Sequence, residues 1–304
     1  MTIRSRKILL KNKTTLIILS LFCTYFIWGS TYLAIRFAIE SFPPFLMVGL
    51  RFTLAGVILY MVMRYLGRPN PTIKEWRSAA IVGLLLPVLG NGTVSHVQLI
   101  VSSSVAALSI ATAPIWMAIF SSFVCEKNKR HKITKQEWLG IAIGFVGIAL
   151  LNLGGSFKGD AASALLLMFA AASWSFGSVW GKHLSMPAGL MGAASQMLCG
   201  GLIALVLSIL FNESWPARIS AKSWGAITFL MFLGSIVAYS AYQWLLKNVR
   251  PLVASSNTFV NPVVAFVVGI WLANETVTMI EYAALAVILV GVYLILSNTS
   301  NETE

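Results

Sequence analysis

The side chains with the clearest chemistry in this sequence are amides and hydroxyls that lie inside an apolar run. The run begins near Leu252 and ends near Leu272. On a helix, i, i+3, i+4 and i+7 spacing places one set of its residues on a single face: Ala254, Asn257, Thr258, Asn261 and Ala265. Hydrocarbon cannot hydrogen-bond an amide, so this face is expected to point into protein or a water-filled cavity. There Asn257 and Asn261 could hydrogen-bond a polar solute.

The same arrangement occurs a second time in the chain. Residues 104–123 form another apolar run, and a shift of 148 residues places Pro114 on Pro262 and Ser109 on Asn257. Proline removes a backbone donor, so both helices are expected to kink at Pro114 and Pro262, which we predict to be hinges. Paired interrupted helices in corresponding halves indicate a transporter binding site, and Ser109 therefore joins the candidate site residues.

Arg51 is the one charge that lies clearly inside an apolar run. A central arginine is unfavourable by roughly 2.5–3.5 kcal/mol on membrane-insertion scales, so its presence needs a reason. In one interpretation it extends toward the membrane surface or pairs with a helix end. In the other it faces a cavity and attracts a carboxylate or another anionic group. The second copy has Ser195 at the matching position, so such a site would be asymmetric.

Aromatic residues stand beside small hydroxyl residues at matching positions of the two copies. Trp28-Gly-Ser-Thr-Tyr and Trp174-Ser-Phe-Gly-Ser follow this pattern. Such residues suit a cavity that binds an organic solute through contact area and a few hydrogen bonds, with Trp28, Thr31 and Trp174 as its lining. Helix packing through small residues explains the pattern equally well. Gly29 and Gly177 are further candidate hinges.

Four more polar residues lie in apolar runs. Asn91, between two glycines, is expected to break the third run. The eighth run contains Tyr239, Tyr242 and Gln243, of which Tyr239 and Gln243 share a helix face. Lining of the cavity and hydrogen bonding between helices are both open for these four.

The residue types needed for catalysis or metal binding are not gathered anywhere in the sequence. None of the ten acidic residues lies deep in an apolar run, the three cysteines form no CxxC pair, and the three histidines have no metal-ligand spacing. We therefore expect no catalytic residues, no metal and no cofactor, and an enzyme or a sensor is disfavoured. The lack of a buried acid also argues against proton-coupled export of cations.

These candidate residues must be positioned by helices in a membrane. The chain is 58% hydrophobic and 11% charged, whereas a soluble domain carries about 25% charged residues. Ten apolar runs are long enough to cross a bilayer, at residues 15–35, 44–65, 78–96, 101–124, 136–153, 161–181, 190–211, 224–246, 252–272 and 280–297. The predicted fold class is an all-α integral membrane protein with ten transmembrane helices.

The ten runs divide into two copies of five. An odd number of spans per copy forces the copies to cross the membrane in opposite senses, which makes an inverted repeat. The predicted organisation is a basic cytoplasmic tail (1–13), a first repeat (14–153), a second repeat (160–297) and a short cytoplasmic tail (298–304). The basic N-terminus and the apolar run after it resemble a signal peptide, but no small-x-small cleavage site follows, so this run is expected to be the first span.

The distribution of the 22 lysines and arginines predicts the orientation. Most lie in the N-terminal tail and in alternate linkers, which places both termini in the cytoplasm. The net charge of +12 is explained by this bias, so we expect no nucleic-acid partner. The expected partners are the lipid bilayer and a small-molecule solute, and a homodimer stays open.

Several short motifs, in this order, resemble the EamA family of the drug/metabolite transporter superfamily. They are Trp28-Gly-Ser, Glu40-Ser-Phe-Pro-Pro, Arg51-Phe, Gly90-Asn-Gly and Asn261-Pro-Val-Val-Ala. The resemblance implies a basket of ten helices around a central cavity, with the fifth and tenth helices supporting it from outside. Relatives commonly export amino acids or other small metabolites, and some handle drugs. Glu275 lies where relatives often carry a Gly-Glu pair, but Asn274 replaces the glycine here.

These observations lead to one main hypothesis and two alternatives. The main one is a bacterial inner-membrane secondary transporter that exports small metabolites such as amino acids by alternating access. Arg51 would attract the solute carboxylate, and the aromatic residues would form walls. A broad-specificity drug or toxicant exporter of the same fold is the first alternative, and a membrane enzyme or sensor is the weaker second one.

Overall fold

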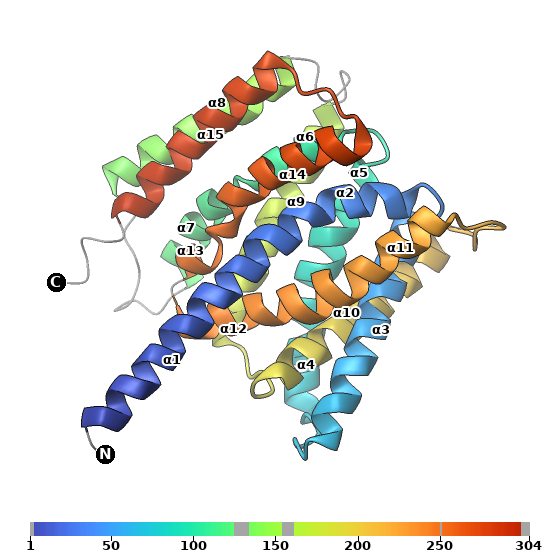
Figure 1. Ribbon diagram of the computed structural model, residues 1–304, viewed down its shortest axis with the longest axis vertical. Coiled ribbons are helices and arrows are strands. Elements are labelled where there is room, and N and C mark those ends of the chain that lie inside the picture. The colour runs from blue at the N-terminus through green and yellow to red at the C-terminus, as the bar shows by residue number, and fades with distance from the viewer. Residues whose placement is uncertain (1–2, 125–133, 154–160, 250, 299–304) are drawn as a thin grey trace.

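The computed structural model describes residues 3–124, 134–153, 161–249 and 251–298, and every regular element in them is a helix (Figure 1). In the first half, the elements are α1 (Ile3–Phe22), η1 (Cys23–Ile27), α2 (Trp28–Ile39), α3 (Pro44–Tyr65), α4 (Ile73–Gly83), η2 (Leu84–Gly92), α5 (Thr93–Val97), α6 (Ser103–Ile110), α7 (Ala113–Val124) and α8 (Lys135–Leu153).

The second half contains α9 (Ala161–Trp180), η4 (Gly181–His183), α10 (Leu190–Leu210), α11 (Ala221–Phe229), η5 (Leu230–Tyr239), α12 (Ser240–Asn248), α13 (Pro251–Ala254), α14 (Asn257–Ala273) and α15 (Met279–Asn298). Local sequence sets several of the boundaries. Pro44 occupies the first turn of α3, where its missing N–H has no partner to lose. Thr72 and Glu75 form a capping box before α4, and Ser102 and Ser220 cap α6 and α11 through their hydroxyls.

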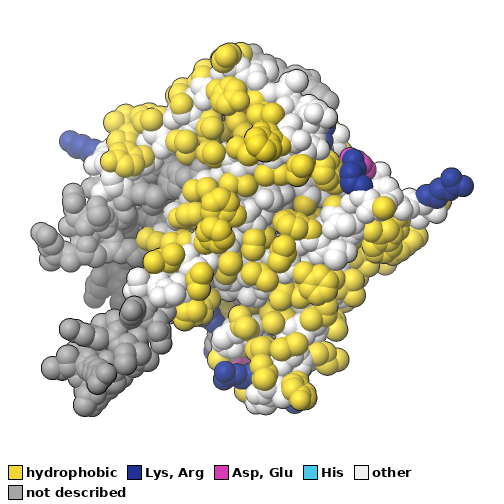
Figure 2. All heavy atoms as spheres, in the orientation of Figure 1, with side chains coloured by type: hydrophobic (Ala, Val, Ile, Leu, Met, Phe, Trp, Pro, Cys, Tyr) yellow, Lys and Arg dark blue, Asp and Glu magenta, His cyan; other side chains and the backbone are white. Residues whose placement is uncertain are grey.

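Consecutive helices join into long apolar rods. Among the described residues, seven are long and apolar enough to cross a membrane, and three shorter apolar helices accompany them at Trp138–Gly147, Val260–Ala273 and Met279–Gly291. The predicted all-α membrane class is therefore confirmed, while the count of ten spans stays a prediction. Figure 2 shows hydrophobic side chains spread over the visible face, with lysine and arginine side chains at its edges. Such a surface suits contact with lipid.

Helices from the two halves pair closely. α3 packs along α10, and α8 packs along α15 at one edge of the bundle (Figure 1). Small residues make this possible, because a Cβ on Gly56 would lie 2.6 Å from the backbone nitrogen of Leu198, and one on Gly291 would lie 2.7 Å from the Gly140 carbonyl oxygen. Close backbone approach through small residues is the usual way in which membrane helices associate.

The two proline-containing helices are interrupted, but not where the prolines stand. α6 ends at Ile110 and α7 begins at Ala113, just before Pro114, whereas α13 and α14 are separated at Ser255–Ser256 and α14 continues through Pro262. Kinks at Pro114 and Pro262, and their role as hinges, stay predictions. A proline ring clashes with the carbonyl four residues earlier. For Pro114 that carbonyl belongs to Ile110, where α6 ends, whereas for Pro262 it belongs to Thr258, inside α14.

The third apolar run is widened rather than broken at Asn91. Residues 84–92 form the π-helical segment η2, and helix α5 follows without interruption. The expected break at Asn91 was therefore wrong. The π-helical segment η5 occupies the corresponding part of the second half, and η1 precedes Trp28. π-Bulges inside helices are frequent at functional sites. η2 supplies Gly90 and Asn91 to the lining of the central cavity described below, and η5 contacts that lining through the Gly234 carbonyl, which accepts from Trp28.

Candidate functional site

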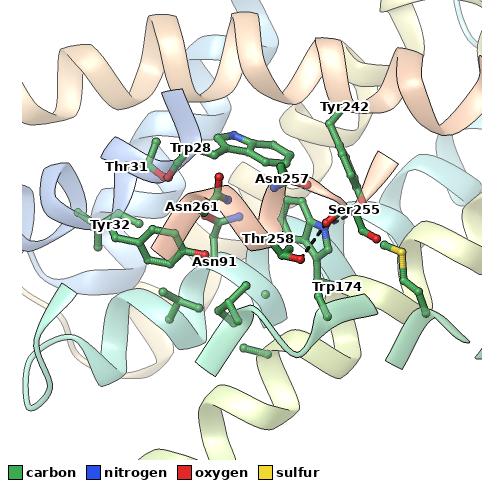
Figure 3. A pocket seen from close by; sticks show the side chains of 17 residues that line it. Trp28, Thr31, Tyr32, Asn91, Trp174, Tyr242, Ser255, Asn257, Thr258 and Asn261 are labelled. Carbon is green, nitrogen blue, oxygen red and sulfur yellow. Dashed lines mark hydrogen bonds between the residues drawn. The ribbon is translucent and has the colours of Figure 1, made fainter. Parts of the chain in front are cut away.

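A central cavity of about 70 Å³ lies between helices from both halves of the chain (Figure 3). The elements α2, η2, α5, α6 and α7 contribute from the first half, and α9, α12, α14 and the α13–α14 turn from the second. Six candidate residues proposed from sequence line the cavity, namely Trp28, Thr31, Asn91, Trp174, Asn257 and Asn261. The structure thus brings together residues that are separated by more than half the chain.

The aromatic wall of the cavity joins the two matched tryptophans. The rings of Trp28 and Trp174 meet edge to face with centroids 5.4 Å apart, and Tyr242 contacts both at 5.0 and 5.6 Å. Each ring also makes a polar contact. Trp174 Nε1 donates to the Tyr242 hydroxyl at 3.2 Å, and that hydroxyl shares a 2.8 Å hydrogen bond with Ser178. Aromatic pairs of this geometry contribute about 0.5–1.5 kcal/mol beyond their buried area, so these contacts stabilise the wall.

An amide pair on α14 forms the polar side of the cavity. One end of the Asn261 amide faces the backbone carbonyls of Asn257 and Tyr25, at 2.9 and 3.0 Å, so that end is the nitrogen. Its oxygen then accepts from Asn257 Nδ2 at 3.0 Å. Asn257 Oδ1 is left without a partner, and the side chain is buried against the cavity. A buried unpaired acceptor is unfavourable until a donor arrives, and a solute N–H or O–H would supply one.

Arg51 lies behind the cavity wall and does not line the cavity. Its Nε donates to Ser235 Oγ on η5 at 2.7 Å, its guanidinium carbon is 4.6 Å from the centre of the Phe52 ring, and its Nη1 has no partner among the described residues. The residue is only 2% exposed, so it is enclosed by protein. A Cβ on Gly234, next to Ser235, would lie 3.0 Å from Arg51 Nη2 and 3.1 Å from Thr31 Cγ2, so the guanidinium lies close to a residue that lines the cavity.

Three other candidates from the sequence lie outside the cavity lining. Ser109 donates back to the Val105 carbonyl at 2.9 Å, within its own helix. Tyr239 donates to Gln196 Oε1 at 2.8 Å, which is a hydrogen bond between helices. Gln243 Nε2 is buried without a partner. Although Tyr239 and Gln243 share a helix face with each other, the residue of that helix that enters the cavity is Tyr242.

The hinge candidates are sites of close packing. A Cβ on Gly29 would lie 2.5 Å from Val264 Cβ, and one on Gly177 would contact Leu86 and lie 2.8 Å from Leu85 Cβ. Both glycines therefore allow neighbouring helices to approach. Whether either residue also bends its helix during transport stays a prediction.

The lining contains Tyr242, for which cavity lining was one of two interpretations, and three residues that we did not select from the sequence: Tyr32, Ser255 and Thr258. Thr258 stands on the polar face of α14 that the periodicity defines, and Tyr32 belongs to the aromatic motif of α2, so both had a signal. None of the lining residues is charged, and the described part of the chain has no cluster of His, Cys, Asp and Glu that could hold a metal. The cavity therefore suits a solute bound by ring contacts and uncharged hydrogen bonds.

Comparisons with known proteins agree with this architecture. The chain matches the model of the EamA-like transporter family over residues 15–153 and again over residues 161–297. It is 40% identical over 277 residues to the inner membrane transporter YedA of Escherichia coli K12, covering 91% of this chain and 89% of that protein. A chloroplast WAT1-related protein of Arabidopsis thaliana is 27% identical over 286 residues, covering 89% of this chain and 67% of that protein.

A solved crystal structure has the same fold, with a TM-score of 0.68 and 18% identity over 95% of this chain and 99% of the other. Family, fold and apolar surface together identify the protein as a membrane transporter, with a small-molecule solute and the lipid bilayer as the partners that this class implies. The chain belongs to the EamA-like transporter family.

Proposed function

We propose that this transporter exports small metabolites such as amino acids across a bacterial inner membrane by alternating access. The observation that carries the proposal is the central cavity, which is lined from both halves and holds the unpaired acceptor Asn257 Oδ1 beside the Trp28–Trp174 wall. A site between two halves can open to either side when one half rocks against the other. The inner-membrane location is supported by the name of the YedA relative, and cytoplasmic termini by the lysine and arginine distribution.

The roles of the lining residues follow from their chemistry. A solute amine or hydroxyl donates to Asn257 Oδ1, while Trp28, Trp174 and Tyr242 cover its apolar part. In the present conformation Arg51 is hydrogen-bonded to Ser235 and does not line the cavity. Its proposed attraction of a solute carboxylate therefore requires a rearrangement that brings the guanidinium to the cavity.

The test is solute efflux from proteoliposomes that contain the purified protein. Vesicles are loaded with labelled amino acids and nucleosides, and efflux is followed with and without an imposed proton gradient. An uncharged hydrogen bond is worth about 0.5–1.5 kcal/mol, so Asn257→Leu should raise the half-saturating concentration about two- to tenfold. The matched control is Asn248→Leu, because Asn248 donates to Trp244 within its own helix and does not line the cavity.

Three outcomes separate the alternatives. Efflux that depends on the gradient indicates proton coupling, and efflux that ignores it indicates a facilitator. Efflux of no panel member would contradict export of amino acids. A broad-specificity exporter of uncharged aromatic toxicants would then be tested with a drug panel, since an aromatic and charge-free lining also suits such compounds.

A further inference from the structure

We propose that a second cavity, at the end of α2, binds an aliphatic α-amino acid as an outer solute site next to the central cavity. This cavity, called the vestibule here, has a volume of about 410 Å³ and lies between the last turn of α2 and the connection from α5 to α6. Its polar lining residues include Arg36, Glu40 and Gln98, and its apolar ones include Ile39, Leu99 and Ile100. The inference rests on the proposed function only in its choice of an amino acid as the solute.

Gln98 connects the vestibule with the central cavity. Its Nε2 donates at 3.1 Å to the backbone carbonyl of Tyr32, a residue that lines the central cavity. Its Oε1 has no partner, although the residue is only 4% exposed. Helix α2 also runs between the two cavities, because Ile35 lines the central cavity and its neighbour Arg36 lines the vestibule. A buried acceptor without a donor is unfavourable. Since Gln98 lines the vestibule, a turn of its amide would let Oε1 accept from an N–H of a ligand there.

Arg36 supplies a cation that can be shared with a ligand. Its Nη1 donates to Glu275 Oε1 at 2.8 Å, and its side chain is 42% exposed. A guanidinium has five N–H donors in a planar fork, and this one ion pair accounts for a single donor. The exposed remainder of the fork suits the carboxylate of a solute, which arginine binds with two parallel hydrogen bonds.

Glu275 does not depend on Arg36 alone. Its carboxylate is 5% exposed and accepts from the backbone nitrogen of Ser103 at 3.2 Å, from the Ser103 hydroxyl at 2.8 and 2.9 Å, and from the Ser104 hydroxyl at 2.9 Å. These donors lie in the first turn of α6, where a negative charge is also favoured by the helix dipole. The carboxylate therefore stays satisfied when Arg36 turns toward a solute.

The remaining walls select the rest of the ligand. Glu40, which is half-exposed and paired with Lys222 at 2.6 Å, adds a carboxylate to the lining of the vestibule. Leu99 and Ile100 are exposed apolar residues that can cover an aliphatic side chain. A carboxylate for Arg36, an ammonium for Gln98 Oε1 and an apolar tail together describe an amino acid such as leucine. A zwitterionic lipid headgroup has the same charges and is the other source of this chemistry.

The test is protection of a cysteine in the vestibule from a membrane-impermeant thiol reagent. Ile100→Cys is introduced after replacing Cys23, Cys125 and Cys199 with serine, and the full-length protein is placed in nanodiscs of phosphatidylglycerol, which has no ammonium group. The probes are L-leucine, 4-methylpentanoate without the amine, and 3-methylbutylamine without the carboxylate. We expect leucine to slow labelling several-fold and either analogue to have little effect. If added phosphatidylethanolamine protects Ile100→Cys as well as leucine does, the vestibule binds a lipid headgroup and not a free solute.

Variants locate the protection. Gln98→Leu or Arg36→Gln should abolish it, and Arg218→Gln, in an exposed linker, should leave it unchanged. In each variant, the rate at which Ile100→Cys is labelled without leucine should be unaltered, which shows that the variant is folded. If Gln98→Leu does not fold, Gln98→Met replaces it. Asn257→Leu, in the central cavity, should preserve protection. Two outcomes would overturn the vestibule site: protection by leucine that persists in Gln98→Leu, and protection that is lost in Asn257→Leu.

Flux measured on the same protein separates this inference from the proposed function. Protection by leucine without leucine efflux supports the vestibule site and contradicts leucine export. Efflux of leucine without protection of the reactive Ile100→Cys thiol contradicts the vestibule site and leaves the proposed function intact. Absence of both contradicts both for leucine.

Discussion

The indole nitrogen of Trp28 on α2 donates to the carbonyl of Gly234 on η5 at 3.0 Å. This hydrogen bond joins the aromatic wall of the central cavity to the π-helical segment that also holds Arg51 through Ser235. η5 therefore links Arg51 to the aromatic wall of the cavity. π-Helical segments inside helices are frequent at functional sites, and we expect a change in the shape of the cavity to be transmitted to η5 through the Trp28–Gly234 hydrogen bond.

Substitution of Gly234 should destabilise the transporter. A Cβ at this position would lie 3.0 Å from Arg51 Nη2 and 3.1 Å from Thr31 Cγ2, and overpacking of this kind costs about 1–3 kcal/mol. We expect Gly234→Ala to lower the melting temperature in detergent and to reduce efflux. Gly225→Ala on α11 is the matched control, since nothing lies within 4 Å of its Cβ position. Equal behaviour of the two variants would contradict the tight packing at Gly234.

Gly29 should act through packing against Val264. A Cβ at Gly29 would lie 2.5 Å from Val264 Cβ, so Gly29→Ala is expected to lower both thermal stability and efflux. Val264→Gly removes the opposing atoms, so the double variant Gly29→Ala/Val264→Gly should regain stability. The single variant Val264→Gly is the control. A double variant that is stable but still inactive would favour the hinge role that the sequence suggests.

We expect Arg51 to destabilise the folded transporter and to contribute to transport of carboxylate-bearing solutes. Its charge is buried with one hydrogen bond to Ser235 and an unpaired Nη1, and replacing buried charges by apolar residues of similar volume is often neutral or stabilising. We expect Arg51→Met to keep or raise the melting temperature while efflux of carboxylate-bearing solutes falls several-fold. Arg51→Ala should be less stable because it leaves a cavity. Unchanged transport and solute preference in Arg51→Met would refute the carboxylate role.

The two ion pairs at this end of the bundle should differ in strength. Arg36 is 42% exposed, about as much as Glu40 and Lys222, but Glu275 is only 5% exposed and also accepts from Ser103 and Ser104 at the start of α6. Replacing this buried acceptor weakens several buried hydrogen bonds, whereas an exposed pair contributes only about 0–1 kcal/mol. Glu275→Gln should therefore lower the melting temperature clearly more than Glu40→Gln. Thermal unfolding of both variants at low and high salt is the measurement, and a larger loss for Glu40→Gln would contradict it.

The amino-acid sequence by itself determined the membrane class and the polar face of α14. Both depend on local properties, namely the length of apolar runs and the helical periodicity that places Asn257 and Asn261 together. The matched tryptophans were also found from sequence, because equivalent positions of a repeat are visible without coordinates. The direct contact between the two rings, with centroids 5.4 Å apart, was not predicted from the sequence.

The tertiary structure decided which polar side chains reach the cavity. Arg51, Tyr239 and Gln98 all lie in apolar surroundings, but their outcomes depend on partners far along the chain: Ser235 for Arg51, Gln196 for Tyr239 and the Tyr32 carbonyl for Gln98. Each group in a low-dielectric interior takes the partner that packing brings within hydrogen-bond distance. The sequence contains the donors and acceptors, but the packing of the helices decides which of them are paired. It leaves Asn257 Oδ1 and Gln98 Oε1 unpaired.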